Sequence, residues 1–116
     1  MPDDTTKKTD TNEAIAKLND QLRRHGIGGR TLITAGVQSL PPHRLAALRL
    51  RIAAFDEFTD DNDPWRERDF GAVDFDGQRY FWKIDYYDPS LTHHSDDPTD
   101  PILTARVMTI MRADEY

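Results

Sequence analysis

The sequence predicts an α+β fold, a two-layer sandwich in which two helices cover one face of an antiparallel sheet of three to four strands. Three observations predict it: two apolar stripes at helical spacing, a pair of alternating runs across an Asp-Gly turn, and a last β-branched run. The elements follow in the order α-β-α-β-β-β. A chain of 116 residues holds one domain. We expect that domain over 12–116, after a disordered polar lead-in over 1–11.

A first helix is predicted over 12–25, and a short β-branched strand over 30–34 follows it. Gly26 is a natural left-handed terminator, and Arg23 lies in the last turn, where a cation suits the negative end of the helix dipole. The glycine-rich segment after the helix precedes a strand, the reverse of a phosphate-binding loop, so we interpret it as a cap and a turn. The apolar stripe of this helix consists of Ile15, Leu18 and Leu22.

A second helix is predicted from Pro42 to about Phe55. Proline is tolerated in a first turn because its missing N–H has no helical partner there. Leu50 points away from the buried stripe and is either ordinary surface or part of an interface. The buried stripe consists of Leu45, Leu48, Ile52 and Phe55.

A β-hairpin formed by 70–75 and 78–87 around Asp76-Gly77 has the most specific pattern in the chain. A two-residue type I′ turn needs φ > 0 at both central positions, which Asp-Gly permits. Opposed residues then have numbers that sum to 153, so Asp74 lies opposite Arg79. One face, expected to contact the helices, carries Val73, Phe75, Tyr80, Trp82, Ile84 and Tyr86. The other face carries Phe70, Ala72, Asp74, Arg79, Phe81, Lys83, Asp85 and Tyr87.

A last strand is predicted over 102–111, and its place in the sheet stays open. We expect Arg106 and Arg112 to limit pairing of this strand with another chain at a sheet edge. Apolar residues occur on both of its faces, which a bulge or burial on both sides explains.

Charge is distributed unevenly along the chain, whose net charge is −6. Residues 1–55 carry a balance of +4 and residues 56–116 a balance of −10. A field of that sign repels phosphates, so we expect no direct nucleic-acid binding and a protein partner with a basic surface. The sequence has no cysteine and no apolar stretch of membrane-spanning length. We therefore expect a cytoplasmic protein that does not contact a membrane.

Several short motifs occur together in the second half of the chain. They are DNDP over 61–64, DFG over 69–71, FWKIDYYD over 81–88, RVMTIM over 106–111 and the closing Glu115-Tyr116. With these motifs the chain resembles a family of small bacterial proteins of unknown function. The resemblance implies frequent carriage on plasmids and other mobile elements, and no known enzyme activity. The family often has an acidic-His-Asp stretch where this chain has Glu67-Arg68-Asp69, so no metal role is carried over there.

Lys83, Asp85 and Tyr87 alternate on one strand and therefore share a face. Together with Asp69, they are residue types used in acid–base catalysis and metal binding. The alternative is a salt-bridged outer sheet face without chemistry. We assign no catalytic residue and no cofactor.

Adjacent histidines, His93 and His94, lie in a loop that is also rich in aspartate. Histidine and carboxylate are ligand types for zinc or manganese, and the alternative is a solvated loop. The Asp60–Asp63 run lacks the spacing, the glycine and the terminal glutamate of a calcium-binding EF-hand, so we expect turn and capping roles for it. We assign no metal ligand.

We expect a non-enzymatic, acidic protein-interaction module of a mobile genetic element, since an acidic surface can occlude a basic groove. Its narrower form is an anti-defence inhibitor of the anti-CRISPR or anti-restriction type. The alternative is a metal-binding protein or small enzyme that uses the face of Asp69, Lys83, Asp85 and Tyr87. A homodimer through the last strand or the outer sheet face is compatible with either. The predicted interaction surface consists of Trp65, Asp74, Arg79, Phe81, Lys83, Asp85, Tyr87 and Asp88.

Overall fold

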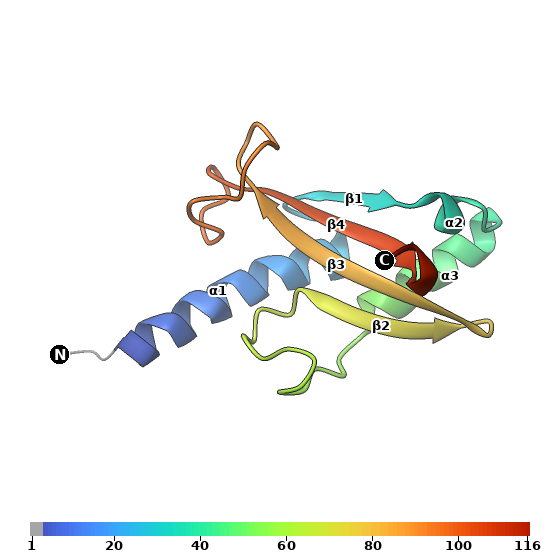
Figure 1. Cartoon of the computed structure of the whole chain (residues 1–116), viewed down its shortest axis with the longest axis horizontal. Coiled ribbons are helices and arrows are strands. Elements are labelled where there is room, and N and C mark those ends of the chain that lie inside the picture. Colours follow the sequence, from blue (N-terminus) through green and yellow to red (C-terminus); the bar gives the residue numbers. More distant parts are fainter. Residues whose placement is uncertain (1–3) are drawn as a thin grey trace.

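The computed structural model describes residues 4–116, and the side chains of residues 11–116. Its elements are α1 (Asp4–His25), β1 (Arg30–Ile33), α2 (Ala35–Gln38), α3 (Pro42–Ala53), β2 (Phe70–Phe75), β3 (Gln78–Tyr87), β4 (Ala105–Arg112) and η1 (Ala113–Glu115). The predicted α+β class is confirmed, with α1 and α3 lying behind the sheet in Figure 1. The four-residue helix α2 is an addition to the predicted order. None of the described helices is both long and apolar enough to cross a membrane.

The sheet is mixed, with the strand order β1-β4-β3-β2. β1 runs parallel to β4, whereas β2–β3 and β3–β4 are antiparallel. A parallel pair needs a long crossover, and here two helices and the whole hairpin separate β1 from β4. The expectation of a wholly antiparallel sheet is corrected in this one pair. β4 is an inner strand, so Arg106 does not guard an edge as expected and is instead buried, 2% exposed.

The hairpin has the predicted register. Asp74 lies opposite Arg79 and Val73 opposite Tyr80, and both turn residues have positive φ, 50° at Asp76 and 76° at Gly77. The predicted inner face is also confirmed, because Trp82 is fully buried. Arg44 of α3 forms an ion pair with Asp76, which ties the turn to the helical layer.

Helix α1 begins at Asp4, eight residues before the predicted start at Asn12. Residues 4–11, expected in a disordered lead-in, are therefore helical, and residues 1–3 of that lead-in lie outside the described residues. No proline or glycine interrupts the sequence between Pro2 and Gly26, so a helix anchored by its buried turns can propagate toward the N-terminus. The predicted left-handed terminator is confirmed, since Gly26 has φ 67°.

The core lies between the helices and the inner face of the sheet. It joins apolar side chains from both layers, namely Ile15, Leu22, Val37, Leu48, Ile52, Phe55, Val73, Tyr80, Trp82, Ile84, Tyr86, Met108 and Ile110. Trp82 packs against Gly71 on β2, where an added Cβ would overlap the indole ring. Phe55 and Phe58 meet the same ring edge-on, with centroids 5.7 and 6.1 Å from it.

Arg23 is part of this core rather than of the solvent-facing end of α1. Its Nη1 donates hydrogen bonds to the carbonyl oxygens of Ile52, Ala53 and Phe55 at 2.9–3.0 Å. Ile52 and Ala53 end α3 and Phe55 follows it, in the region where carbonyls lack the usual i→i+4 partner of a helix. Nη2 donates to Asp20 at 3.0 Å, so the buried cation is paired. Arg23 thus joins the two long helices.

The C-terminal turn folds back onto the opposite face of the sheet. The Glu115 carboxylate accepts hydrogen bonds from the Thr34 hydroxyl at 2.7 Å and from the Gly36 N–H at 2.9 Å. The Thr34 hydrogen bond is the main cause that lowers the pKa of Glu115. Residues just after β1 therefore hold the segment after β4 in place.

Candidate functional site

The outer face of the sheet is the face opposite to α1 and α3. It carries the side chains of Arg79, Phe81, Lys83, Asp85 and Tyr87 from β3, as predicted, and those of Phe70, Ala72 and Asp74 from β2. The register adds Ala105, Val107, Thr109 and Met111 from β4. The predicted residues on these two strands are thus brought together on one surface.

The outer face has an apolar floor beneath its charged residues. Val107 lies opposite Asp85, and Met111 lies opposite Phe81. Although both point away from the helices, they are only 6% and 4% exposed. Burial on both sides of β4, one of the two predicted explanations for its pattern, is confirmed. The charged pair above this floor is Lys83 and Asp85, whose Nζ and Oδ2 atoms lie 3.3 Å apart.

Three aromatic rings from distant segments meet on the outer face. Phe70 and Phe81 have centroids 5.3 Å apart, and Tyr116 lies edge-on to both, at 6.2 and 5.6 Å. Tyr116 is nevertheless 76% exposed. Such pairs add about 0.5–1.5 kcal/mol beyond area burial, so the cluster stabilises an aromatic patch that still faces solvent.

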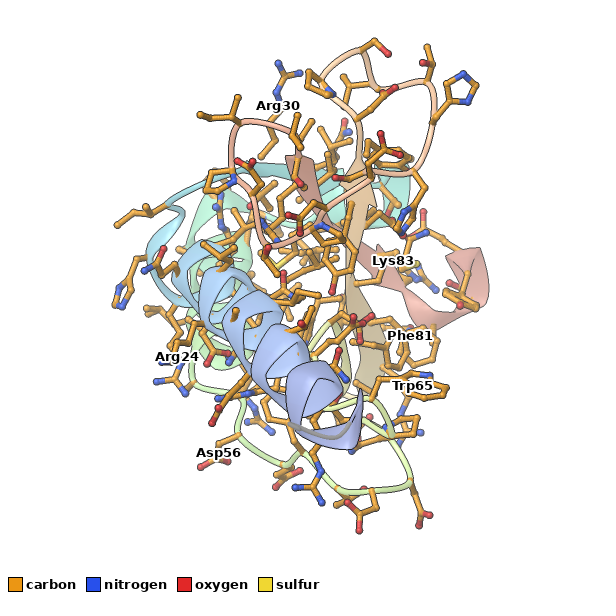
Figure 2. All side chains as sticks on the ribbon, turned by 90° about the vertical axis from the view of Figure 1, so that its left-hand side faces the viewer. Arg24, Arg30, Asp56, Trp65, Phe81 and Lys83 are labelled. Carbon is orange, nitrogen blue, oxygen red and sulfur yellow. The ribbon has the colours of Figure 1, made fainter. Side chains whose placement is uncertain are left out.

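The other predicted surface residues have different surroundings. Asp74 and Arg79 form an exposed ion pair at 2.9 Å, and the Arg79 hydrogen bond lowers the pKa of Asp74. Asp88 is turned toward its own loop, where it accepts hydrogen bonds from the Ser90 hydroxyl and the Thr92 N–H. Trp65 stands on a loop outside the sheet, on the same side of the molecule as Phe81 and Lys83 in Figure 2.

An acidic hollow opens where β2 begins and β3 ends. Its volume is about 350 Å³, and it is lined by Glu67, Asp69, Ile84, Asp85, Tyr86, Tyr87, His94 and Pro98. Burial raises the pKa of the Glu67 carboxyl, and the charges of Asp69 and Asp63 raise it further. Burial likewise raises the pKa of Asp69, with added repulsion from Asp63 and Asp85. These carboxylates are therefore costly to ionise in the folded chain.

A buried polar network supports the inner wall of this hollow. Asn19 of α1 is fully buried, and its Nδ2 donates to the Tyr86 hydroxyl at 2.8 Å and to the Glu67 carbonyl at 3.0 Å. Arg106 donates through Nε to Asn19 Oδ1 at 2.8 Å, and its guanidinium lies 5.1 Å from the Tyr86 ring. Burial raises the pKa of the Tyr86 hydroxyl, so Tyr86 acts as a neutral hydrogen-bonding group.

The histidine loop is organised by its own side chains. Asp97 accepts hydrogen bonds from the N–H and hydroxyl of Thr99, and Asp100 accepts one from the Ile102 N–H at 2.9 Å. His94 Nδ1 lies 2.8 Å from the Ser95 carbonyl, which only accepts, so Nδ1 carries the proton. Among the side chains described, no three histidine or carboxylate groups are placed to hold one metal ion.

Two acidic loops flank one end of the sheet. Figure 1 shows the loops 56–69 and 88–104 beyond the same end of the sheet, where β2 begins and β3 ends. The arginines of α3 belong to the other layer. The end of the molecule next to the acidic hollow therefore carries much of the negative charge.

Sequence reasoning missed three contributors to this region. The sequence predicts Phe70 on the outer face but not in the interaction surface, and it presents Tyr116 only as part of a motif. Glu67 is named only where the chain departs from the family's acidic-His-Asp stretch. The hairpin register offered a signal for Phe70, which lies opposite Lys83. Nothing local in the sequence shows that the chain folds back to bring Tyr116 onto Phe81.

Comparison with known proteins places the chain in a family. No curated protein and no solved structure matches it. Residues 33–115 match the model of a family described as "Protein of unknown function (DUF3768)". The match runs from the end of β1 to the C-terminal turn and includes the hairpin, the acidic hollow and β4. Because it covers well over half of the sequence, the chain belongs to this family.

Proposed function

We propose that this protein is a non-enzymatic interaction module that binds a protein with a basic surface through its outer face. The observation that carries the proposal is the aromatic patch of Phe70, Phe81 and Tyr116 on the outer face, in which Tyr116 is 76% exposed and the other two rings are partly exposed. The two acidic loops lie beyond one end of this face. Aromatic anchors next to a complementary charged rim are typical of protein interfaces. The acidic rim steers a basic partner and sets the orientation in which it docks.

A narrower form of the proposal is an anti-defence inhibitor carried by a mobile genetic element and acting in the cytoplasm. A nuclease or nucleic-acid-binding effector has a basic groove, and an acidic domain can occupy that groove in place of a phosphate backbone. The negative balance of residues 56–116 supports this form. Inhibition of anti-CRISPR or anti-restriction type is its testable consequence.

Affinity capture with matched variants tests the proposal. Phe81→Ala removes the centre of the aromatic patch, whereas Leu50→Ala removes an exposed side chain from α3, 72% exposed. We expect a partner that is retained by the wild type and by Leu50→Ala but lost with Phe81→Ala. Retention should weaken as salt rises, because exposed charges are screened. Recovery of no partner even at low salt would count against the proposal.

A second candidate function is acid–base chemistry or metal binding at the acidic hollow, where a metal ion would have to draw its ligands together, because no three of them surround one point in the described residues. The observation that favours it is the raised pKa of Glu67 and Asp69 beside Asp85 and His94, since perturbed pKa values gather at functional sites. Manganese or zinc, added to protein stripped of metal, should then raise the melting temperature of the wild type and not of Asp69→Asn. An unchanged melting temperature would leave the interaction module as the better proposal.

A further inference from the structure

A second hollow lies outside the sheet, between α1 and the loop that connects α3 to β2. Its volume is about 620 Å³, within the range of pockets that hold ligands. Two kinds of residues line it. The apolar side consists of Phe58, Pro64 and Trp65, and the polar lining consists of Asn12, Glu13, Thr59, Asp60, Asp63, Arg66 and Arg68.

Trp65 forms an exposed wall of this hollow and is held by an ordered loop. It is 69% exposed, although a tryptophan gains free energy when its ring leaves water. Arg66 and Arg68 have left-handed backbones, with φ of 57° and 54°, which non-glycine residues adopt at some cost. Asp63 holds the turn by accepting a hydrogen bond from the Arg68 N–H at 3.1 Å. These interactions hold the backbone that carries the indole.

The charged residues that line the hollow are acidic by one, with Glu13, Asp60 and Asp63 against Arg66 and Arg68, and the loop that carries Trp65 is strongly acidic. Residues 56–69 carry seven carboxylates and two guanidiniums, a balance of −5. Arg68 turns toward α1, where it pairs with Asp20 at 2.7 Å. Arg66 meets Asp60 only at 3.5 Å, and both side chains are highly exposed, 76% and 90%. Surface pairs of this kind contribute little, so Asp60 is available to another cation.

We infer that this hollow receives an arginine side chain from a basic segment of the protein partner. The guanidinium stacks on the Trp65 indole while Asp60 and Glu13 accept its hydrogen bonds. An indole is the best aromatic acceptor for a cation, and guanidinium is suited both to stacking and to bidentate carboxylate contacts. The inference rests on the proposed function, because it identifies which feature of the basic partner this end of the molecule recognises.

Two tryptophans with opposite exposure make the inference measurable in the full chain. Trp65 is 69% exposed and Trp82 fully buried, so a ligand at the hollow perturbs the emission of Trp65 alone. The probe is an eight-residue peptide of alternating arginine and alanine, with lysine–alanine and glutamate–alanine peptides as controls. We expect the arginine peptide to quench Trp65 and protect it from acrylamide, and to bind more tightly than the lysine peptide. The glutamate peptide should not bind.

Variants separate stacking from general charge attraction. Calorimetry should show the arginine peptide binding about threefold to thirtyfold more weakly to Trp65→Ala. Leu50→Ala, which removes another exposed apolar side chain, should bind like the wild type. Asp60→Asn should also weaken binding, and circular dichroism should show that all three variants keep the fold.

Three outcomes would overturn the inference. They are equal affinity of wild type and Trp65→Ala for the arginine peptide, equal affinity of the wild type for arginine and lysine peptides, and a dimer that Trp65→Ala dissociates. Any of these can occur while Phe81→Ala still abolishes partner capture, in which case the proposed function stands and only the Trp65 site fails. If Phe81→Ala leaves capture intact while the arginine peptide binds at Trp65, the outer face is the part that fails.

Discussion

The two faces of β3 show how one strand can serve both stability and recognition. On the inner face, Tyr80, Trp82, Ile84 and Tyr86 are all less than 8% exposed. On the outer face, the alternate residues are half-buried and include a Lys83–Asp85 ion pair. The inner face is closed by two helices, so its side chains must be apolar or fully hydrogen-bonded. We therefore expect a substitution at an inner-face residue of β3 to lower stability, and one at the neighbouring outer-face residue to weaken partner binding.

The largest effect is expected from Trp82→Ala on the inner face. Removing a fully buried indole leaves a cavity beside Phe55, Phe58 and Arg23 and should reduce the free energy of unfolding by about 3–5 kcal/mol. Urea denaturation measures it, and Trp65→Ala is the matched control, expected to change stability by less than about 0.5 kcal/mol. Similar losses of stability from both substitutions would contradict the difference in burial between Trp82 and Trp65.

A smaller loss is expected from Gly71→Ala on β2. The added methyl group meets the Trp82 indole, and overpacking of this kind costs about 1–3 kcal/mol. Ala72→Gly, at the next position and on the outer face, is the companion variant. Thermal unfolding should show Gly71→Ala as the more damaging of the two, whereas the reverse order would contradict the assignment of these residues to opposite faces.

On the outer face, Asp85→Ala and Tyr87→Ala should leave stability nearly intact. Both residues are partly exposed, and an ion pair like that of Asp85 with Lys83 contributes at most about 1 kcal/mol. The melting temperature should therefore change little while capture of the partner weakens. If a variant has a clearly lower melting temperature but still captures the partner, the substituted residue supports the fold and not the interface.

The smallest effect is expected from Asp69→Asn, and it depends on pH. Because the pKa of Asp69 is raised in the folded chain, its ionised form opposes folding at neutral pH, and this cost disappears as the carboxyl is protonated. Asp69→Asn should thus be more stable than the wild type at pH 7, with a difference that shrinks toward zero as pH falls below about 4. Urea midpoints measured across this range test the sign. Asp61→Asn controls for the loss of one exposed negative charge.

The hairpin could be predicted because its information is local. Asp76-Gly77 fixes the turn, the turn fixes the register, and strict alternation assigns the faces, so Trp82 was placed inside from sequence alone. The buried stripe of α3 was found for the same reason, since helical spacing lies within one segment. These predictions concern residues that are close together in the chain.

The burial of Arg23 and Arg106 could not be predicted because most of their partners are distant in the sequence. Arg23 donates to backbone carbonyls 29–32 residues later, and carbonyls are the same at every residue. Arg106 was expected at a sheet edge because the sequence alone does not show that β1 pairs with the free side of β4. The Trp65 hollow had only an exposed tryptophan and an acidic run as its signal, since its α1 side comes from about fifty residues earlier.

The position of β4 inside the sheet has a consequence for the order in which the protein folds during synthesis. β4 pairs with both β1 and β3, yet it is the last of these four strands to leave the ribosome. Until Ala105 and the residues after it emerge, β1 has no strand beside it and the β2–β3 hairpin lacks its third strand. A two-stranded hairpin is only marginally stable. Until β4 emerges, the aromatic side chains of β3 therefore stay exposed on the nascent chain, and the four-stranded sheet forms in one late step.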